Sequence, residues 1–268
     1  MLAILLLFLV ILGIFFWVAD KRKPQFCILM YHHVSPVINT EEKTYYVNAE
    51  MFADQINMIL KKGYTPISLS QLEKIYTQKT MLSSHAVMIT LDDGWEDNYT
   101  YAFPILQKMK VPATIFLSTA YIDQAEGVLN RSQIDEMHAS GLIEFSSHGV
   151  NHKRLRDLTD EEVLDELTQS KSIIEEKLGK PLLTFCYPYG AFDIRIRSLV
   201  FKAGYKIDIG TRKGLNNWPW KPSSSLRRTH VLYNESIEDF YNELRKGCKT
   251  KLSGSKNATI ETPTYLLN

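Results

Sequence analysis

The chain has 268 residues, of which 45% are hydrophobic and 23% are charged, an ordinary composition for a globular protein with a sizeable core. Its 31 basic and 30 acidic residues leave a formal charge of +1. This balance excludes a bulk electrostatic attraction to nucleic acid, and the chain shows neither a basic stripe nor zinc-finger spacing. Nucleic acid is therefore not an expected partner.

The N-terminal segment differs from the rest of the chain. Residues 2–19 are all apolar or glycine, and Lys21-Arg22-Lys23 follows shortly after them. A helix of this length is just long enough to cross a bilayer, and the segment lacks the small-x-small cleavage site of a signal peptide. We therefore expect residues 1–24 to form an uncleaved, single-pass anchor in the cell membrane. The basic cluster favours a cytoplasmic position for the residues that follow.

Residues 25–250 alternate between strand-like and helix-like segments, and residues 251–268 lack any periodicity and are expected to form a loose tail. Apolar runs predict strands at 26–31, 65–69, 86–91, 113–118, 142–146, 183–187, 206–209 and 226–231. Helical spacing of apolar residues predicts helices at 49–62, 99–109 and 194–202. Capping residues predict four more: a short helix from Ser70, with Glu73 as its capping partner, a helix from Ser132 to Gly141, a long helix from Thr159 to Gly179, with Glu162 as its capping partner, and a last helix from Ser236 to about 246.

This alternation with short links predicts a parallel sheet covered by helices. The number of units approaches what a closed barrel needs. The expected fold class is therefore α/β, a distorted (β/α) barrel with about seven parallel strands. Cys27, Cys186 and Cys248 have no paired spacing, and we interpret the first two, which lie in apolar runs, as buried free thiols.

Chemically reactive residues collect where predicted strands end. Asp92-Asp93-Gly94, His32-His33, His148 and the run 187–190 each follow a strand, and His152 lies four positions beyond His148. In a parallel barrel all the carboxyl ends of strands open on one face, where active sites lie. We therefore expect these residues to converge.

The set is typical of a metal-dependent hydrolase. A helical turn would bring His148 and His152 to the same side, and with one carboxylate they form a two-His, one-Asp set that suits a catalytic zinc or another divalent metal. Adjacent aspartates on an extended chain point in different directions, so one can bind metal while the other acts as a base. Taken singly, each pattern also has a structural interpretation, such as a turn for Asp-Asp-Gly and for Tyr-Pro-Tyr-Gly.

Two motifs resemble a known family. Thr90-Leu91-Asp92-Asp93-Gly94 and His148-Gly149-Val150-Asn151-His152 resemble the first two motifs of the polysaccharide deacetylases, the NodB-homology group of carbohydrate esterase family 4, and the resemblance runs from about residue 26 to 246. It implies a distorted (β/α) barrel, a divalent metal that is commonly Zn²⁺, with Co²⁺, Ni²⁺ or Mn²⁺ as alternatives, and an acetylated polysaccharide substrate. It also implies a role for each motif residue: Asp92 as general base, Asp93, His148 and His152 as metal ligands, and the Tyr189 backbone N–H in the oxyanion hole.

The chain departs from the family pattern at two places. The third motif usually opens with an arginine, but Cys186 stands there, and Arg227 or Arg228 is the candidate replacement. The late Leu-x-His that supplies the acid is not evident, since Thr229-His230-Val231 is a poor match. Met30-Tyr31-His32-His33-Val34 instead resembles the permuted arrangement of the poly-β-1,6-N-acetylglucosamine deacetylase branch, which implies that His32 is the acid, with His33 as the alternative.

The expected function is the metal-dependent removal of acetyl groups from N-acetylglucosamine residues of a cell-surface or cell-wall polysaccharide. A catalytically inactive, membrane-anchored glycan-binding protein and a metal-dependent amidase or peptidase are the alternatives. We expect Trp95, Tyr187 and Trp218 to contact the sugar, with a core position as the alternative for Trp95. The chain is expected to be a monomer with its catalytic domain outside the cell, against the orientation that the basic cluster favours.

Overall fold

A computed structural model describes residues 24–36, 43–83, 85–220, 224–233 and 235–246. The predicted tail at 251–268, Cys248 and all but the last residue of the predicted anchor lie outside these ranges. Within them, no helix combines the length and the apolar character that crossing a membrane requires.

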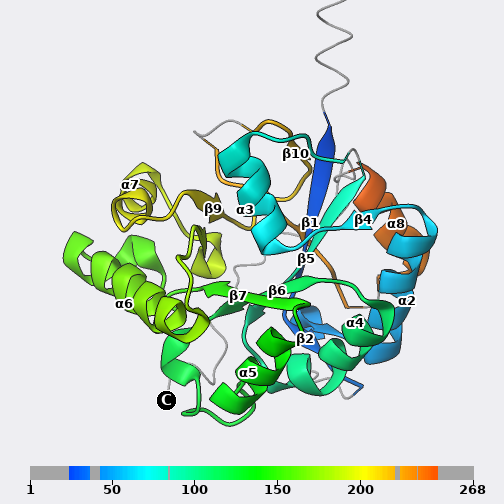
Figure 1. The fold of residues 1–268 in the computed structure, drawn as a ribbon, viewed down its shortest axis with the longest axis horizontal. Coiled ribbons are helices and arrows are strands. Elements are labelled where there is room, and N and C mark those ends of the chain that lie inside the picture. The colour runs from blue at the N-terminus through cyan, green and yellow to red at the C-terminus, as the bar shows by residue number, and fades with distance from the viewer. Residues whose placement is uncertain (1–23, 37–42, 84, 221–223, 234, 247–268) are drawn as a thin grey trace, which may run out of the picture.

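A curled, mainly parallel sheet forms the centre of the molecule (Figure 1). Its main path runs β10-β1-β5-β6-β7-β8-β9, with β4 also on β5 and β11 also on β1; of these strands, β10 is antiparallel to its neighbour. The strands of this sheet are β1 (Gln25–Tyr31), β4 (Thr65–Pro66), β5 (Ala86–Asp93), β6 (Ala113–Leu117), β7 (Ile143–Ser147), β8 (Thr184–Cys186), β9 (Ile207–Ile209), β10 (Asn216–Asn217) and β11 (Thr229–His230). A separate pair joins β2 (His33–Val34) to β3 (Tyr46–Val47).

Residues 226–230 link the two ends of the sheet. Leu226 forms a parallel bridge with Ile209 at the end of β9, and Thr229 pairs with Leu29 of β1. The sheet therefore curls around a common interior. The predicted α/β class is confirmed, and the predicted distorted barrel of about seven parallel strands takes the form of a curled, mainly parallel sheet in the described residues.

Helices surround the sheet, with α6 and α7 packed together on one side and α2 and α8 on the other (Figure 1). The α-helices are α2 (Ala49–Lys61), α3 (Leu69–Gln78), α4 (Phe103–Met109), α5 (Arg131–Ala139), α6 (Asp160–Leu178), α7 (Ile194–Lys202) and α8 (Ile237–Lys246). The single-turn helices are η1 (Lys43–Tyr45), η2 (Asn98–Ala102), η3 (Thr119–Tyr121), η4 (Leu155–Asp157) and η5 (Pro188–Gly190).

The capping residues differ from the prediction at two of these helices. The capping box of Thr159 with Glu162 at α6 is confirmed. At α3 the cap is Ser68 with Gln71 instead of Ser70, and at α5 it is Asn130 with Gln133 instead of Ser132. In both cases an equally good cap two residues upstream starts the helix earlier, because its glutamine partner completes the box.

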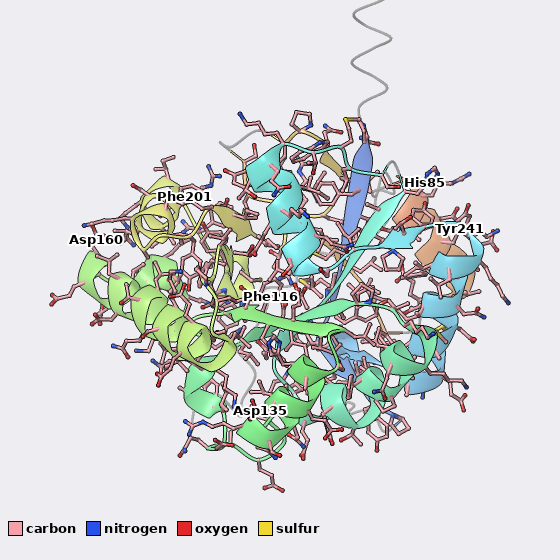
Figure 2. All side chains as sticks on the ribbon, in the orientation of Figure 1. His85, Phe116, Asp135, Asp160, Phe201 and Tyr241 are labelled. Atoms are coloured by element: carbon pink, nitrogen blue, oxygen red, sulfur yellow. The ribbon has the colours of Figure 1, made fainter. Side chains whose placement is uncertain are left out.

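Two separate apolar cores follow from the alternation of side chains along each strand. Leu29 and Ile89 point outward into the core beneath the surrounding helices. Ile28 and Met88 point into the interior of the sheet, where they join the fully buried Phe116 and residues of α3. Figure 2 shows Phe116 near the middle of the fold. Thr90 and Asp92 lie two and four positions beyond Met88, so they share its inward-facing side of the strand.

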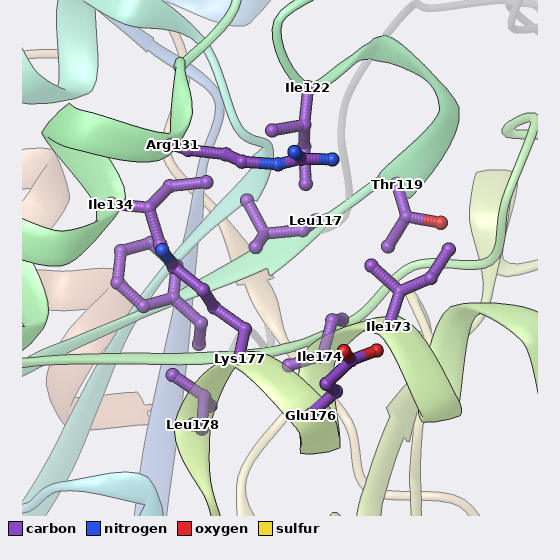
Figure 3. Close-up of a pocket in the computed structure, with 11 residues that line it drawn as sticks. Leu117, Thr119, Ile122, Arg131, Ile134, Ile173, Ile174, Glu176, Lys177 and Leu178 are labelled. Atoms are coloured by element: carbon purple, nitrogen blue, oxygen red, sulfur yellow. The ribbon is translucent and has the colours of Figure 1, made fainter.

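A cavity of about 460 Å³ lies in the outer core between α5 and α6. Leu117, Ile134 and Ile174 contribute to its apolar wall, while Arg131 and Lys177 lie along it (Figure 3). Both cations form ion pairs with neighbouring aspartates.

One buried ion pair joins the last part of the sheet to α7. Arg197 donates from Nε and Nη2 to the two carboxylate oxygens of Asp208, at 2.8 and 3.0 Å. The hydroxyl of Tyr187 donates to the same carboxylate at 3.1 Å. Because all three groups are buried, removal of the Asp208 carboxylate leaves the Arg197 guanidinium buried without a counter-charge.

We expect Asp208→Ala to lower the free energy of unfolding by about 3–5 kcal/mol, since it leaves a buried charge uncompensated. The matched control is Asp135→Ala, which removes an ion pair with Lys177 from a carboxylate that is 60% exposed, and which should cost less than about 1 kcal/mol. Urea denaturation of both variants measures the difference. Equal losses would contradict this account of the pair.

Candidate active site

Strand β5 continues through both aspartates that follow its apolar run. The strand ends at Asp93 and not at Leu91, because Asp92 pairs with Phe116 and Asp93 with Leu117 of β6. Asp92 points into the sheet interior, beyond Thr90. The backbone then turns at Asp93, whose φ of 75° lies in the left-handed region, and Gly94 continues the turn with a φ of 84°.

Arg228 binds the carboxylate of Asp92 with both ends of its guanidinium group. Nη1 donates to Oδ1 at 2.6 Å and Nη2 donates to Oδ2 at 2.7 Å. Burial opposes ionisation of Asp92, but the Arg228 charge beside it lowers the pKa of Asp92 below its usual value. The choice between Arg227 and Arg228 is thereby decided, and the arginine enters from the segment that joins the sheet edges.

Asp93 faces the two histidines of the second motif. Its Oδ1 lies 3.1 Å from Nε2 of His152 and 3.6 Å from Nε2 of His148. This oxygen is buried and accepts no hydrogen bond. The two imidazole rings lie with centroids 5.0 Å apart, although residues 148–152 form a bend and not the predicted helical turn.

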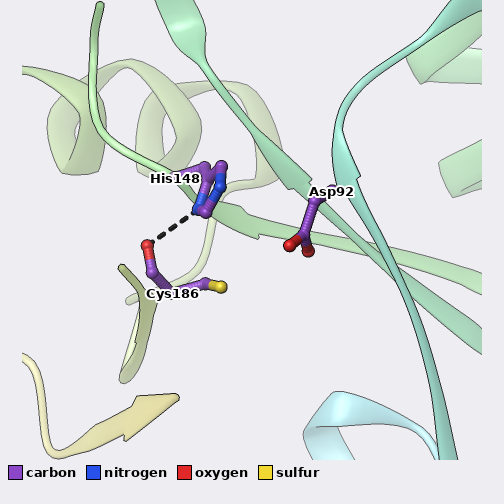
Figure 4. Close-up of side chains that lie close together, drawn as sticks. All are labelled: Asp92, His148 and Cys186. Atoms are coloured by element: carbon purple, nitrogen blue, oxygen red, sulfur yellow. Dashed lines mark hydrogen bonds between the residues drawn. The ribbon is translucent and has the colours of Figure 1, made fainter. Parts of the chain in front are cut away.

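The outer nitrogen of each histidine has its own partner. Nδ1 of His148 lies 2.8 Å from the carbonyl oxygen of Cys186 (Figure 4), so it carries the proton and leaves a lone pair on Nε2. Nδ1 of His152 lies 3.1 Å from the hydroxyl of Tyr189. Partners of this kind orient metal-binding histidines.

These three side chains fit a divalent cation. Their ligand atoms all lie within 4.8 Å of one another, and the unpaired Asp93 oxygen points between the two imidazoles. Burial lowers the pKa of His148 to about 4, so the ring is neutral and able to bind metal at pH 7. Burial opposes the charged form of Asp93, but His152 holds the pKa of Asp93 well below its ordinary value. Two imidazoles and one carboxylate form a donor set that suits zinc.

A second group of potential ligands, Asp92, His148 and Cys186, lies beside the first (Figure 4). Both oxygens of Asp92 already accept from Arg228. Burial raises the pKa of the Cys186 thiol well above its usual value, which disfavours the thiolate that metal binding requires. The group that contains Asp93 is therefore the better candidate for a metal site.

Backbone strain is concentrated in this region. Asp93, His152 and Tyr189 have φ values of 75°, 50° and 58°, and they are three of the six non-glycine residues with positive φ among those the structure describes. Such conformations cost free energy and persist only where the surrounding structure imposes them. The next residue, Gly190, has no room for a side chain, since an added Cβ would lie 2.0 Å from Oγ1 of Thr211.

The two histidines after β1 have different surroundings. Nε2 of His32 lies 3.9 Å from Oδ2 of Asp92, and burial lowers the pKa of His32 although the nearby carboxylates oppose this shift. His33 instead bonds to Asp97, with 2.6 Å between Nδ1 and Oδ2, and its ring stacks between Tyr46 and Trp95. His32 is therefore the histidine that faces the base.

The predicted sugar contacts are largely wrong. Tyr187 is fully buried, and its hydroxyl donates to Asp208. Trp218 is 6% exposed and its backbone N–H donates to the Pro24 carbonyl, at the amino end of β1, away from the site. Trp95 is 7% exposed and its indole N–H donates to Asp93 at 3.3 Å, which matches the core alternative. Large aromatic residues looked suited to sugar stacking, but packing placed them inside.

Glu166 is a site residue that sequence reasoning missed. Its carboxylate accepts hydrogen bonds from the loop between His148 and His152. No motif marks a glutamate in the middle of a long helix, so only the packing of α6 against this loop shows its position.

Comparisons with known proteins agree with this geometry. Residues 79–207 match the family model described as polysaccharide deacetylase. The chain is 28% identical over 198 residues to the Bacillus subtilis protein YxkH, covering 74% of this chain and 68% of that protein. It is 27% identical over 178 residues to the poly-β-1,6-N-acetyl-D-glucosamine N-deacetylase of Staphylococcus aureus, covering 62% of this chain and 61% of that protein's length.

The fold has a solved counterpart. The Streptococcus pyogenes deacetylase PplD, determined in complex with acetate, superposes with a TM-score of 0.76 and 26% identity, over 83% of this chain and 99% of that one. The family match shows a polysaccharide deacetylase domain over residues 79–207, and the chain is similar to these relatives in sequence and to PplD in fold.

Proposed function

We propose that this protein is a metal-dependent deacetylase that removes N-acetyl groups from N-acetylglucosamine residues of a cell-surface or cell-wall polysaccharide. The observation that carries the proposal is the buried Oδ1 of Asp93, which accepts no hydrogen bond and lies 3.6 Å from Nε2 of His148 and 3.1 Å from Nε2 of His152. The name of the staphylococcal relative supports an N-acetylated glucosamine polymer as the substrate class.

Asp93, His148 and His152 would hold the cation, for which zinc is our first candidate because of the mixed nitrogen and oxygen donors. When bound, a divalent cation there supplies Lewis-acid polarisation of a carbonyl oxygen and acidifies water. Trp95 donates to Asp93 Oδ2, and so leaves Oδ1 for the cation.

Asp92 accepts the proton of the attacking water. Arg228 keeps this carboxylate charged and fixes its direction by the two-point contact. The negative charge that develops on the acetyl oxygen needs preorganised donors, and the backbone N–H of Tyr189 is our candidate for this role.

His32 delivers a proton to the sugar nitrogen. An amide nitrogen leaves readily only when it is protonated, so a positioned acid is required. Nε2 of His32 lies 3.9 Å from Oδ2 of Asp92, so the proposed acid stands beside the proposed base.

We also propose that the protein is attached to the cell membrane. The apolar run at 2–19 would hold the protein in the cell membrane by a single span, with the catalytic domain outside, where such polymers lie. A monomer suffices, since every proposed catalytic and metal-binding residue comes from one chain.

We expect the purified protein with Zn²⁺ to release acetate from poly-β-1,6-N-acetylglucosamine oligomers, and a chelator to abolish this release until metal is restored. The measurement is free acetate across a panel of N- and O-acetylated glycans and acetylated peptides. Release from O-acetylated glycans alone would contradict the substrate assignment. Release of amino acids without acetate would favour a metal-dependent amidase, and saccharide binding without turnover would favour an inactive binding protein.

We expect Asp92→Asn to retain zinc and lose about 10²- to 10⁴-fold in turnover, the range for removal of a positioned base. The variant keeps all three proposed ligands, so zinc content after dialysis should equal that of the wild type. Near-full turnover in a zinc-loaded variant would show that Asp92 is not the base.

We expect His32→Gln to lower kcat by about 10²-fold or more, because the leaving nitrogen loses its proton donor. His33→Gln is the matched control, since it changes the neighbouring imidazole that bonds to Asp97. If His33→Gln abolished turnover in the folded, zinc-loaded protein while His32→Gln spared it, the acid role would pass to His33.

A further inference from the structure

The three-residue connection between His148 and His152 determines whether the two histidines face one cation. The segment has no regular secondary structure, and Gly149 and His152 both have positive φ values, of 85° and 50°. A bent segment of this kind does not hold its shape by itself. Its backbone groups must therefore be fixed by neighbouring elements.

The carbonyl groups of the connection are satisfied from η3. The backbone N–H of Thr119 donates to the Gly149 carbonyl at 3.1 Å, and that of Ala120 donates to the Val150 carbonyl at 3.0 Å. The Tyr121 hydroxyl donates to the Asn151 carbonyl at 3.2 Å.

The N–H groups are satisfied mainly by Glu166 of α6. Its Oε2 accepts from the backbone N–H of Val150 at 2.7 Å and from that of Asn151 at 2.9 Å. Its Oε1 accepts from the Asn151 side-chain amide at 2.7 Å. One carboxylate therefore binds three donors of the segment between the two histidines.

The Glu166 carboxylate is buried against the connection between the two histidines. The residue is 5% exposed, and a buried carboxylate is unfavourable unless hydrogen bonds compensate it. Gly149 leaves the space that the carboxylate needs, since a Cβ there would lie 3.1 Å from Oε2. Helix α6 is tied to β7 independently, because the Ser170 and Ser147 hydroxyls are 2.7 Å apart.

We propose that Glu166 is a positioning residue for the metal centre: it holds residues 149–151 so that Nε2 of His148 and Nε2 of His152 meet at Asp93. This inference rests on the proposed metal-dependent function. Ligand distances in a metal site tolerate only about ±0.2 Å, so a small shift of this connection weakens binding without unfolding the domain.

The test compares zinc affinity with stability. We expect Glu166→Ala to bind Zn²⁺ about tenfold more weakly or worse, within the range seen when supporting partners of ligands are removed. The control is Asp165→Ala, an exposed carboxylate on the same helix, which should stay within about twofold of the wild type. Affinity is measured by competition with a chromophoric chelator, and the Tm of each metal-free protein is measured in parallel.

A pair of substitutions at positions 151 and 166 tests the contact between Asn151 and Glu166 directly. This test remains possible if Glu166→Ala does not fold. Asn151→Asp sets a carboxylate against the carboxylate of Glu166 and should weaken zinc binding through repulsion. Adding Glu166→Gln restores a donor opposite the new carboxylate at position 151, so the double variant should bind Zn²⁺ more tightly than Asn151→Asp alone. This recovery is a coupling that a residue important only for stability would not produce.

Two results would overturn the inference alone, provided that the wild type binds zinc and releases acetate. One is a folded Glu166→Ala variant that binds zinc as tightly as the wild type. The other is a double variant that binds zinc no more tightly than Asn151→Asp. Failure of the wild type to bind Zn²⁺ at all overturns the proposed function together with this inference.

Discussion

The arrangement of the site depends on the presence of two adjacent carboxylates in a place with little access to water. Burial of a charged carboxylate is unfavourable unless a partner compensates it. Asp92 and Asp93 are compensated in different ways. Asp92 has the guanidinium of Arg228 on both oxygens, whereas Asp93 has two imidazoles and one oxygen without a hydrogen bond. This difference separates Asp92, which Arg228 keeps charged and which has lone pairs left to accept a proton, from Asp93, whose Oδ1 lies between the two imidazoles.

The closure of the sheet and the chemistry of the site are linked through Arg228. The segment that carries it joins β9 to β1, and the Arg228 side chain runs through the sheet interior, where Nε donates to the Gly210 carbonyl and the guanidinium group lies 5.8 Å above the Phe116 ring. Cys186, which stands where the family has an arginine, has a short side chain that leaves this interior space to Arg228. In this chain the guanidinium that binds Asp92 comes from Arg228, directly before β11.

The backbone around the site is strained at Asp93, His152 and Tyr189, and stable elements outside the site impose this strain. Helix α6 and η3 bind the connection between the histidines from two sides. The Arg197–Asp208 pair and Tyr187 support the chain on either side of Tyr189. Preorganised ligands of this kind lose little freedom when a cation binds, which agrees with a site built for metal.

The amino-acid sequence by itself determined the order of strands and helices and indicated that Asp93, His148 and His152 lie together, because side-chain periodicity and short motifs are local properties. It did not distinguish Arg227 from Arg228, and it contained no sign of Glu166. It also placed Trp218 and Tyr187 at the sugar, although both are buried elsewhere. Only the tertiary structure decided these points, because the Arg228–Asp92 contact spans 136 positions of the chain, and such contacts depend on how the sheet curls and packs, which no local pattern encodes.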